Sequence, residues 1–175
     1  MMPKKWAVAL YDTPVYNTQD IKSLFEIKNG RLVALDEKGL LRELEMIAPV
    51  GTRFEVVEDL GEDVLKIRTQ AYEYEKEFFV DARLVSQLFF EPKPKPVYMP
   101  TKEEILANLK NIAKEDKKKN IAYVWGGNVR AGLLHLKEFY PRKEKLKNYD
   151  ANYYIYKGLD CSGMLYEASF GFTPR

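Results

Sequence analysis

Four prolines within residues 92–100 divide this 175-residue chain into two parts: Pro92, Pro94, Pro96 and Pro100. Each proline lacks a backbone N–H donor and biases the residue before it toward extended geometry, so we expect a semi-rigid linker there. The charge changes sign at the same place, because residues 1–91 carry a net charge of −5 and residues 92–175 carry +7. The sequence therefore predicts two domains, residues 1–91 and residues 101–175, joined by this linker.

The composition excludes several classes of protein. With 46% hydrophobic residues, the chain can bury a core and is not predicted to be disordered. No stretch approaches the ~20 apolar residues that cross a bilayer, and the first residues lack the apolar core of a signal peptide. The overall net charge of +2 gives no argument for nucleic-acid binding. A single cysteine and a single histidine exclude an intramolecular disulfide and a Cys/His zinc site, so we expect neither a metal nor a cofactor.

The two predicted domains differ in their secondary-structure pattern. In residues 1–91, short apolar or alternating runs recur between turn signals such as Asn29-Gly30, and this pattern predicts a small barrel or sandwich of five or more strands. After the linker, Thr101 and Glu104 have the spacing of a capping box, and an apolar stripe with helical spacing follows. We therefore predict an amphipathic helix over residues 101–118. The predicted strands lie in residues 6–11, 31–35, 52–57, 64–67 and 78–85.

Cys161 lies where a second helix is expected to begin. Asp160 is a favoured N-cap residue and Gly171 a favoured C′ residue, so residues 161–171 are predicted to form a helix with the cysteine in its first turn. The unpaired N–H groups at a helix N-terminus stabilise a thiolate and can also face an oxyanion. A free cysteine is more often a small buried hydrophobe. The polar neighbours of Cys161 favour a nucleophile instead.

A second motif precedes this helix in the sequence. Tyr123 and Trp125 are followed by Gly126-Gly127, and two adjacent glycines let another backbone or a substrate approach closely. On its own, the segment is more typical of a strand end and turn with both aromatic side chains in the core.

Together, the sequences YVWGGN at residues 123–128 and LDCSG at residues 159–163 resemble the paired signature of the NlpC-type cell-wall endopeptidases. These are papain-like cysteine peptidases that cut peptidoglycan stem peptides. The strands of residues 1–91 resemble the bacterial Src-homology-3-like modules that commonly precede such domains. The resemblance implies an α+β chain, with a small N-terminal β-barrel followed by the N-terminal half of a papain-like catalytic domain.

The resemblance also implies roles for individual residues. Cys161 is then the nucleophile that attacks an amide carbonyl, and the Tyr123 hydroxyl lies near its thiolate and helps to stabilise the oxyanion. Trp125 packs in or near the cleft, while Asp160 and Ser162 line the substrate side. The carboxylate of Asp160 is suited to pair with the free amino group of a stem peptide. The expected ligands are stem peptides or muropeptides, cut between a γ-linked D-glutamyl residue and a diamino acid.

The chain departs from the family in its histidine. Cysteine peptidases of this type need an imidazole base, which the family carries on a strand well after the cysteine. Only fourteen residues follow Cys161, and His135 lies twenty-six residues before it. We expect His135 to be a surface or core histidine. The chain is therefore expected to be a truncated, inactive piece of a longer enzyme, with a C-terminal segment as its partner.

A second departure is the stretch of 32 residues between the two motifs, residues 129–160, which is longer than the family usually has. Its tyrosines, lysines and arginines could cap the cleft over an acidic substrate, but a solvated insertion whose tyrosines pack on the domain is the preferred interpretation.

Two other functions remain open. One is a cell-wall module that binds stem peptides without cutting them, and the other is a papain-like amidase or acyltransferase with a different substrate. The location also remains open, because a wall hydrolase acts outside the membrane unless it trims imported wall peptides in the cytoplasm.

Overall fold

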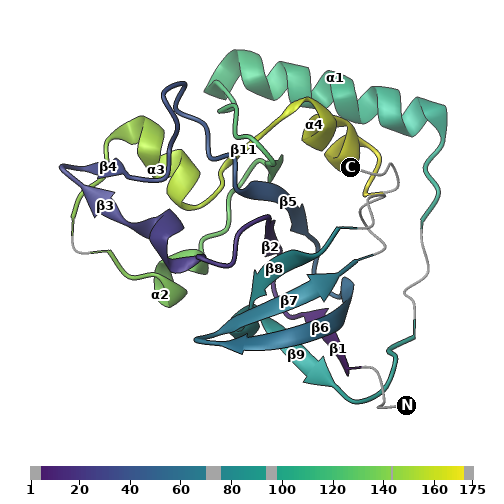
Figure 1. The fold of residues 1–175 in the computed structure, drawn as a ribbon. Helices are drawn as coiled ribbons and strands as arrows, with labels where there is room; N and C mark the ends of the chain where they lie inside the picture. Colours follow the sequence, from purple (N-terminus) through teal and green to yellow (C-terminus); the bar gives the residue numbers. More distant parts are fainter. Residues whose placement is uncertain (1–4, 70–75, 94–97, 143, 172–175) are drawn as a thin grey trace.

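The computed structural model describes residues 5–69, 76–93, 98–142 and 144–171. These residues form a mixed α+β structure, which confirms the predicted α+β class, while the β-barrel and the papain-like half-domain stay predictions (Figure 1). Part of the predicted linker, residues 94–97, lies outside the described residues.

A seven-stranded antiparallel sheet forms most of the N-terminal part (Figure 1). The inward side chains that alternate along its strands form a dry core, in which Leu65 and Val80 lie opposite each other on neighbouring strands. The edge strands are the first and last in the order below, so within the described residues the sheet is open and no closed barrel forms. The order is β5 (Leu44–Ala48), β2 (Thr13–Tyr16), β8 (Phe78–Asp81), β7 (Val64–Arg68), β6 (Arg53–Gly61), β1 (Lys5–Ala9) and β9 (Val85–Leu88).

The remaining elements are short, apart from one long helix. The predicted turn at Asn29-Gly30 is confirmed, since both residues have positive φ and join β3 to β4. The elements are η1 (Lys22–Phe25), β3 (Ile27–Lys28), β4 (Arg31–Leu32), η2 (Ala82–Leu84), α1 (Lys102–Lys119), β10 (Asn128–Val129), α2 (Leu136–Phe139), α3 (Asn148–Tyr154), β11 (Gly158–Leu159) and α4 (Cys161–Ala168).

The predicted amphipathic helix is α1, and its capping box is formed as expected. The Thr101 hydroxyl accepts from the Glu104 N–H, and the Glu104 carboxylate accepts from the Thr101 N–H. In Figure 1, α1 runs along the outside of α4, and the two helices pack together. Arg130 links them, because its guanidinium donates to Glu115 of α1 and to Glu167 of α4.

The helix that begins at Cys161 ends earlier than expected. It was predicted over residues 161–171 with Gly171 as the C′ residue, but α4 ends at Ala168. Phe170 takes the left-handed conformation at φ 55°, and its N–H bonds the Glu167 carbonyl while the Gly171 N–H bonds the Tyr166 carbonyl. This pair of bonds is a Schellman motif with Phe170 at C′ and Gly171 at C″, so the helix ends one residue earlier than it would with Gly171 at C′.

The largest core cluster joins the two parts of the chain. Tyr16 of β2 and Tyr156, which follows α3, are both buried, and their hydroxyls lie 3.0 Å apart. Phe25 stacks on Tyr140 with ring centroids 3.7 Å apart. The tyrosines of residues 129–160 therefore pack into the structure, as the preferred interpretation of that stretch predicted. The predicted domain boundaries at residues 91 and 101 stay a prediction, but residues on both sides of them share one core.

Candidate active site

Cys161 is exposed and is the first residue of α4. It opens into a cavity of about 350 Å³. All five predicted site residues line this cavity, so the fold brings together two motifs that are more than thirty residues apart in the sequence. The lining residues are Glu45, Tyr123, Trp125, Gly126, Asp160, Cys161 and Ser162.

Asp160 holds the two motifs together. As the N-cap of α4, it accepts at Oδ1 from the Gly163 N–H at 2.6 Å and from the Ser162 hydroxyl at 3.0 Å. Its other oxygen, Oδ2, accepts from the Gly126 N–H at 2.9 Å. One carboxylate therefore fixes both the start of the cysteine helix and the loop that carries Trp125.

The paired glycines allow close backbone contacts, as predicted. Gly126 has φ +71°, and a Cβ there would lie 2.5 Å from the Leu44 carbonyl oxygen of β5. A Cβ on Gly127 would lie 2.8 Å from the Gly158 carbonyl oxygen. The loop is thus held between the edge strand of the large sheet on one side and β11, which leads into α4, on the other.

Tyr123 presents a protonated hydroxyl to this cavity. Its pKa is raised above the usual value by desolvation, and further by electrostatic interaction with Asp160 and Cys161. A tyrosine hydroxyl with a raised pKa stays protonated at neutral pH and can donate a hydrogen bond. The arrangement therefore pairs an exposed thiol with a neutral O–H donor in one solvent-accessible cavity.

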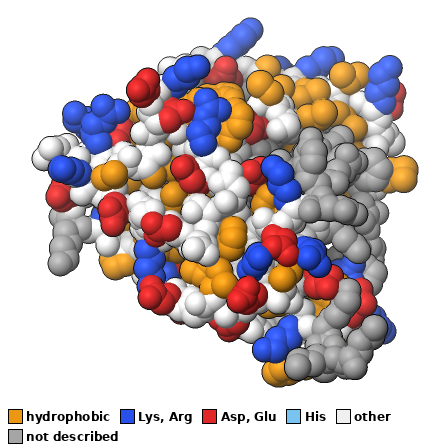
Figure 2. Space-filling model, in the orientation of Figure 1, with side chains coloured by type: hydrophobic (Ala, Val, Ile, Leu, Met, Phe, Trp, Pro, Cys, Tyr) orange, Lys and Arg blue, Asp and Glu red, His pale blue; other side chains and the backbone are white. Residues whose placement is uncertain are grey.

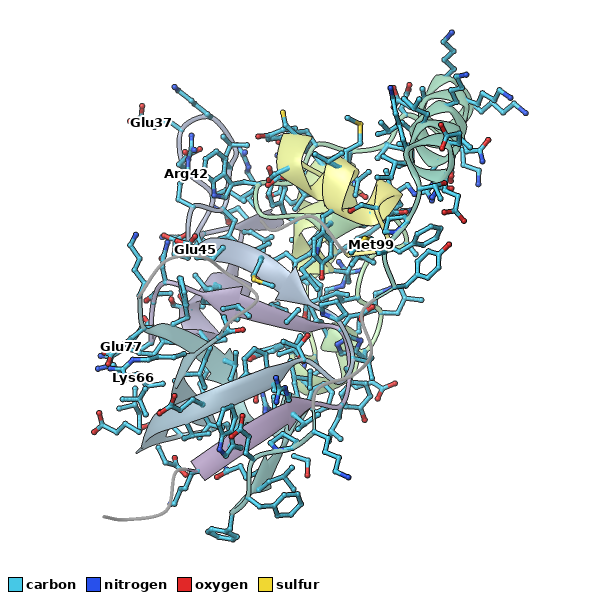
Figure 3. All side chains as sticks on the ribbon, turned by 90° about the vertical axis from the view of Figure 1, so that its right-hand side faces the viewer. Glu37, Arg42, Glu45, Lys66, Glu77 and Met99 are labelled. Atoms are coloured by element: carbon cyan, nitrogen blue, oxygen red, sulfur yellow. The ribbon has the colours of Figure 1, made fainter. Side chains whose placement is uncertain are left out.

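Two residues of the N-terminal part also belong to this site. Glu45 of β5 lines the cavity, and the Arg42 guanidinium lies 4.3 Å from the centroid of the Trp125 ring. Figure 3 shows both along one edge of the molecule. Neither residue has a local sequence signal for this site, because both belong to a segment that precedes the cysteine by more than a hundred residues.

His135 does not line the cavity. Its ring stacks on Tyr11 with centroids 4.9 Å apart and lies edge-on to Phe139. Desolvation lowers its pKa, and the nearby charges of Asp12 and Glu138 oppose that change. The position agrees with the expectation of a surface or core histidine.

An apolar surface lies beside the cysteine helix. Figure 2 shows hydrophobic side chains gathered over the end of the molecule that α1 and α4 form. Phe170 is 60% exposed and Met99 is 72% exposed. We call this set the α1/α4 surface: Met99, Leu106, Met164, Leu165 and Phe170.

Comparison with known proteins gives no relative for this chain: no family model, no curated protein and no solved structure matches it. No helix in the described part is long and apolar enough to span a membrane. Within the same residues, no three His, Cys, Asp or Glu side chains are grouped as metal ligands.

Proposed function

We propose that this protein is a cysteine endopeptidase that acts on peptidoglycan stem peptides. The observation that carries the proposal is the exposed Cys161 at the start of α4, in one cavity with Tyr123, Trp125 and Asp160. The resemblance of both motifs to NlpC-type peptidases supplies the substrate class and the scissile γ-D-glutamyl bond. On this proposal the large sheet corresponds to the Src-homology-3-like module, and residues 101–171 to the front half of a papain-like domain.

The geometry supports amide attack by the thiolate. The Cys161 sulfur forms a bond to the carbonyl carbon, and the electron pair of the carbonyl moves to its oxygen. Backbone N–H groups at the start of α4 and the Tyr123 hydroxyl are donors for that oxyanion. The C–N bond then breaks as the leaving amine takes a proton, and water hydrolyses the thioester.

The carboxylates of the cavity support a substrate with a free amino group. Glu45 and Asp160 come from different parts of the fold and line the same cavity as the thiol. Two carboxylates near one another attract an ammonium group, and the charge-assisted hydrogen bonds that result are among the stronger ones in proteins. A stem peptide with a free N-terminus offers such a group.

The proton acceptor requires a further proposal, because the only histidine in the sequence stacks on Tyr11. We propose that a polypeptide segment bearing the imidazole packs on the α1/α4 surface, where exposed apolar side chains lie on the helix that carries Cys161. On this proposal, residues 1–175 bind and are acylated by substrate but turn it over slowly.

Covalent capture tests this function without requiring turnover. We expect L-alanyl-γ-D-glutamyl chloromethyl ketone to add once to the protein at Cys161, as measured by intact mass and peptide mapping. Acetylating the amino group of the reagent should slow labelling about tenfold, the effect of losing one charged hydrogen bond of about 1.5 kcal/mol. Cys161→Ala should not be labelled.

The outcomes separate the candidate functions. Equal labelling by the peptide reagent and by chloroacetone, which lacks the peptide, would contradict the proposal. Reversible binding of L-alanyl-γ-D-glutamate without covalent capture by its chloromethyl ketone would instead favour the module that binds stem peptides without cutting them.

A further inference from the structure

Arg42 is held in place more firmly than an ordinary surface arginine. Its Nε donates to Asp36 Oδ2 at 2.9 Å, and its guanidinium lies over the Trp125 ring. Asp36 is itself fixed, because Oδ1 accepts from the backbone N–H of Lys38 at 2.9 Å and of Leu40 at 2.8 Å. These bonds from the Leu40 N–H and from Arg42 hold the pKa of Asp36 below its usual range, so the carboxylate stays ionised.

The contacts leave the far end of the guanidinium available. Asp36 engages the Nε edge, and within the described residues neither Nη1 nor Nη2 donates to a protein acceptor. The side chain of Arg42 is 41% exposed. A planar guanidinium whose two terminal nitrogens make no hydrogen bond to the described residues is suited to bind a carboxylate through two parallel hydrogen bonds.

Trp125 places this cation at the rim of the site. The indole lines the cavity of Cys161, and the positive charge of Arg42 acts on Tyr123, whose pKa it lowers against the other influences. The cavity thus has carboxylates from Glu45 and Asp160, and a cation at the edge of its Trp125 wall.

We propose that Arg42 forms a carboxylate-binding subsite at the rim of the Cys161 cavity, so that the site selects a dipolar substrate that carries both an ammonium group and a carboxylate. The inference deepens the proposed function and rests on it for the identity of the substrate. Asp36 and Trp125 are positioning residues in this subsite, because they orient the guanidinium without themselves binding the carboxylate.

The sole cysteine of the chain provides the test. 3-Maleimidopropionate and 3-maleimidopropionamide differ only in carrying a carboxylate or its neutral amide, and the amide reports the reactivity of the thiol itself. The ratio of their second-order rate constants at pH 7 and low salt measures attraction of the carboxylate near Cys161. We expect Arg42→Gln to lower this acid/amide ratio about threefold or more, the effect of losing a partly exposed charge pair.

Two further variants define the subsite. Lys38→Gln removes the same charge from the same loop, but its side chain has no contact with Trp125 among the described residues, so the ratio should stay near that of the wild type. Arg42→Lys should give an intermediate ratio, because the charge remains while the planar fork is lost. This variant also keeps the test valid if Arg42→Gln disturbs the loop.

An acid/amide ratio that is the same in wild type, Arg42→Gln and Arg42→Lys would overturn the inference, as would an equal fall in Lys38→Gln. The result is distinct from that of peptide capture. If the peptide reagent labels Cys161 but the acid/amide ratio is unchanged in the Arg42 variants, only the carboxylate subsite is wrong. If the ratio falls while the peptide reagent fails, the carboxylate subsite holds and the proposed substrate is wrong.

Discussion

Asp160 shows what local sequence can and cannot reveal about a single residue. Its position before Cys161 predicts the N-cap correctly, because an N-cap bonds a backbone group two or three residues away. Its bond to the Gly126 N–H crosses 34 residues and depends on the tertiary fold. The same limit explains why the sequence predicts five cavity residues and misses Glu45 and Arg42. The five lie in recognisable motifs, whereas long-range packing brings Glu45 to the cavity and Arg42 to the Trp125 ring.

The two roles of Asp160 predict an unusual response to asparagine. Asn and Asp are nearly equivalent at ordinary N-caps. Here both oxygens accept from N–H or O–H groups, so the NH₂ of an asparagine would face a donor. We expect Asp160→Asn to lower the free energy of unfolding by about 1–3 kcal/mol, close to the effect of Asp160→Ala.

Urea denaturation of each variant measures this effect. Thr101→Asn is the matched control, because it alters a cap on α1 where asparagine is accepted, and it should cost less than about 0.5 kcal/mol. Wild-type stability in Asp160→Asn would show that the bond to Gly126 contributes little.

At the scale of elements, caps and periodicity predicted the long helix and the start of α4, whereas the short helices α2 and α3 were missed. The N-cap residues of α2 and α3, His135 and Lys147, make no side-chain capping bond. These short helices form because they bury Leu136, Tyr153 and Tyr154 in the shared core. The end of α4 was misplaced because a phenylalanine, with no local preference for positive φ, occupies the C′ position.

The loop that carries Gly126 is packed between β5 and β11, and we expect it to accommodate a side chain at Gly126 poorly. Gly126 and Gly61 have nearly the same φ, +71° and +75°, but a Cβ meets the Leu44 carbonyl at Gly126 and nothing within 4 Å at Gly61. Gly61→Ala should therefore cost about 1–2 kcal/mol from backbone strain alone. We expect Gly126→Ala to cost a further 1–3 kcal/mol, because the added methyl group displaces β5 from the loop, as overpacking does elsewhere.

Thermal and urea unfolding of the two alanine variants separate these contributions. If Gly61→Ala and Gly126→Ala lose similar amounts of unfolding free energy, the loop can move away from β5 at little cost.

At the scale of the whole molecule, residues on both sides of the predicted linker pack into one hydrophobic core. The charge shift and the prolines correctly marked a change in secondary structure, from mainly strands to mainly helices. The charge shift and the prolines carry no information on packing between the two parts, because tyrosines as far apart in the sequence as Tyr16 and Tyr156 come into contact only in the folded chain. The contact between Tyr11 and His135 is another junction of this kind.

That junction predicts a pH dependence of stability. Desolvation lowers the pKa of His135 in the folded state, whereas an unfolded histidine titrates near 6.5. As the pH falls, His135 therefore binds a proton in the unfolded chain before it does so in the folded chain. The stability that neutral His135 contributes is fully present above about pH 6.5 and is lost as the pH falls below that value. We expect the free energy of unfolding to decrease from pH 7 to pH 5.5, and His135→Gln to flatten that decrease.

Urea unfolding at several pH values between 7 and 5.5 provides the measurement. If the free energy of unfolding falls equally with pH in wild type and His135→Gln, groups other than His135 cause the pH dependence.

The placement of Arg42 and Glu45 beside a cysteine from the far end of the chain has a consequence for engineering. A chimera that joined residues 101–175 to a foreign front half would keep Cys161 and lose Glu45 from the lining of its cavity. If the proposed function is correct, substrate preference in such a protein would change with the graft even though every residue of the two cysteine-side motifs was retained.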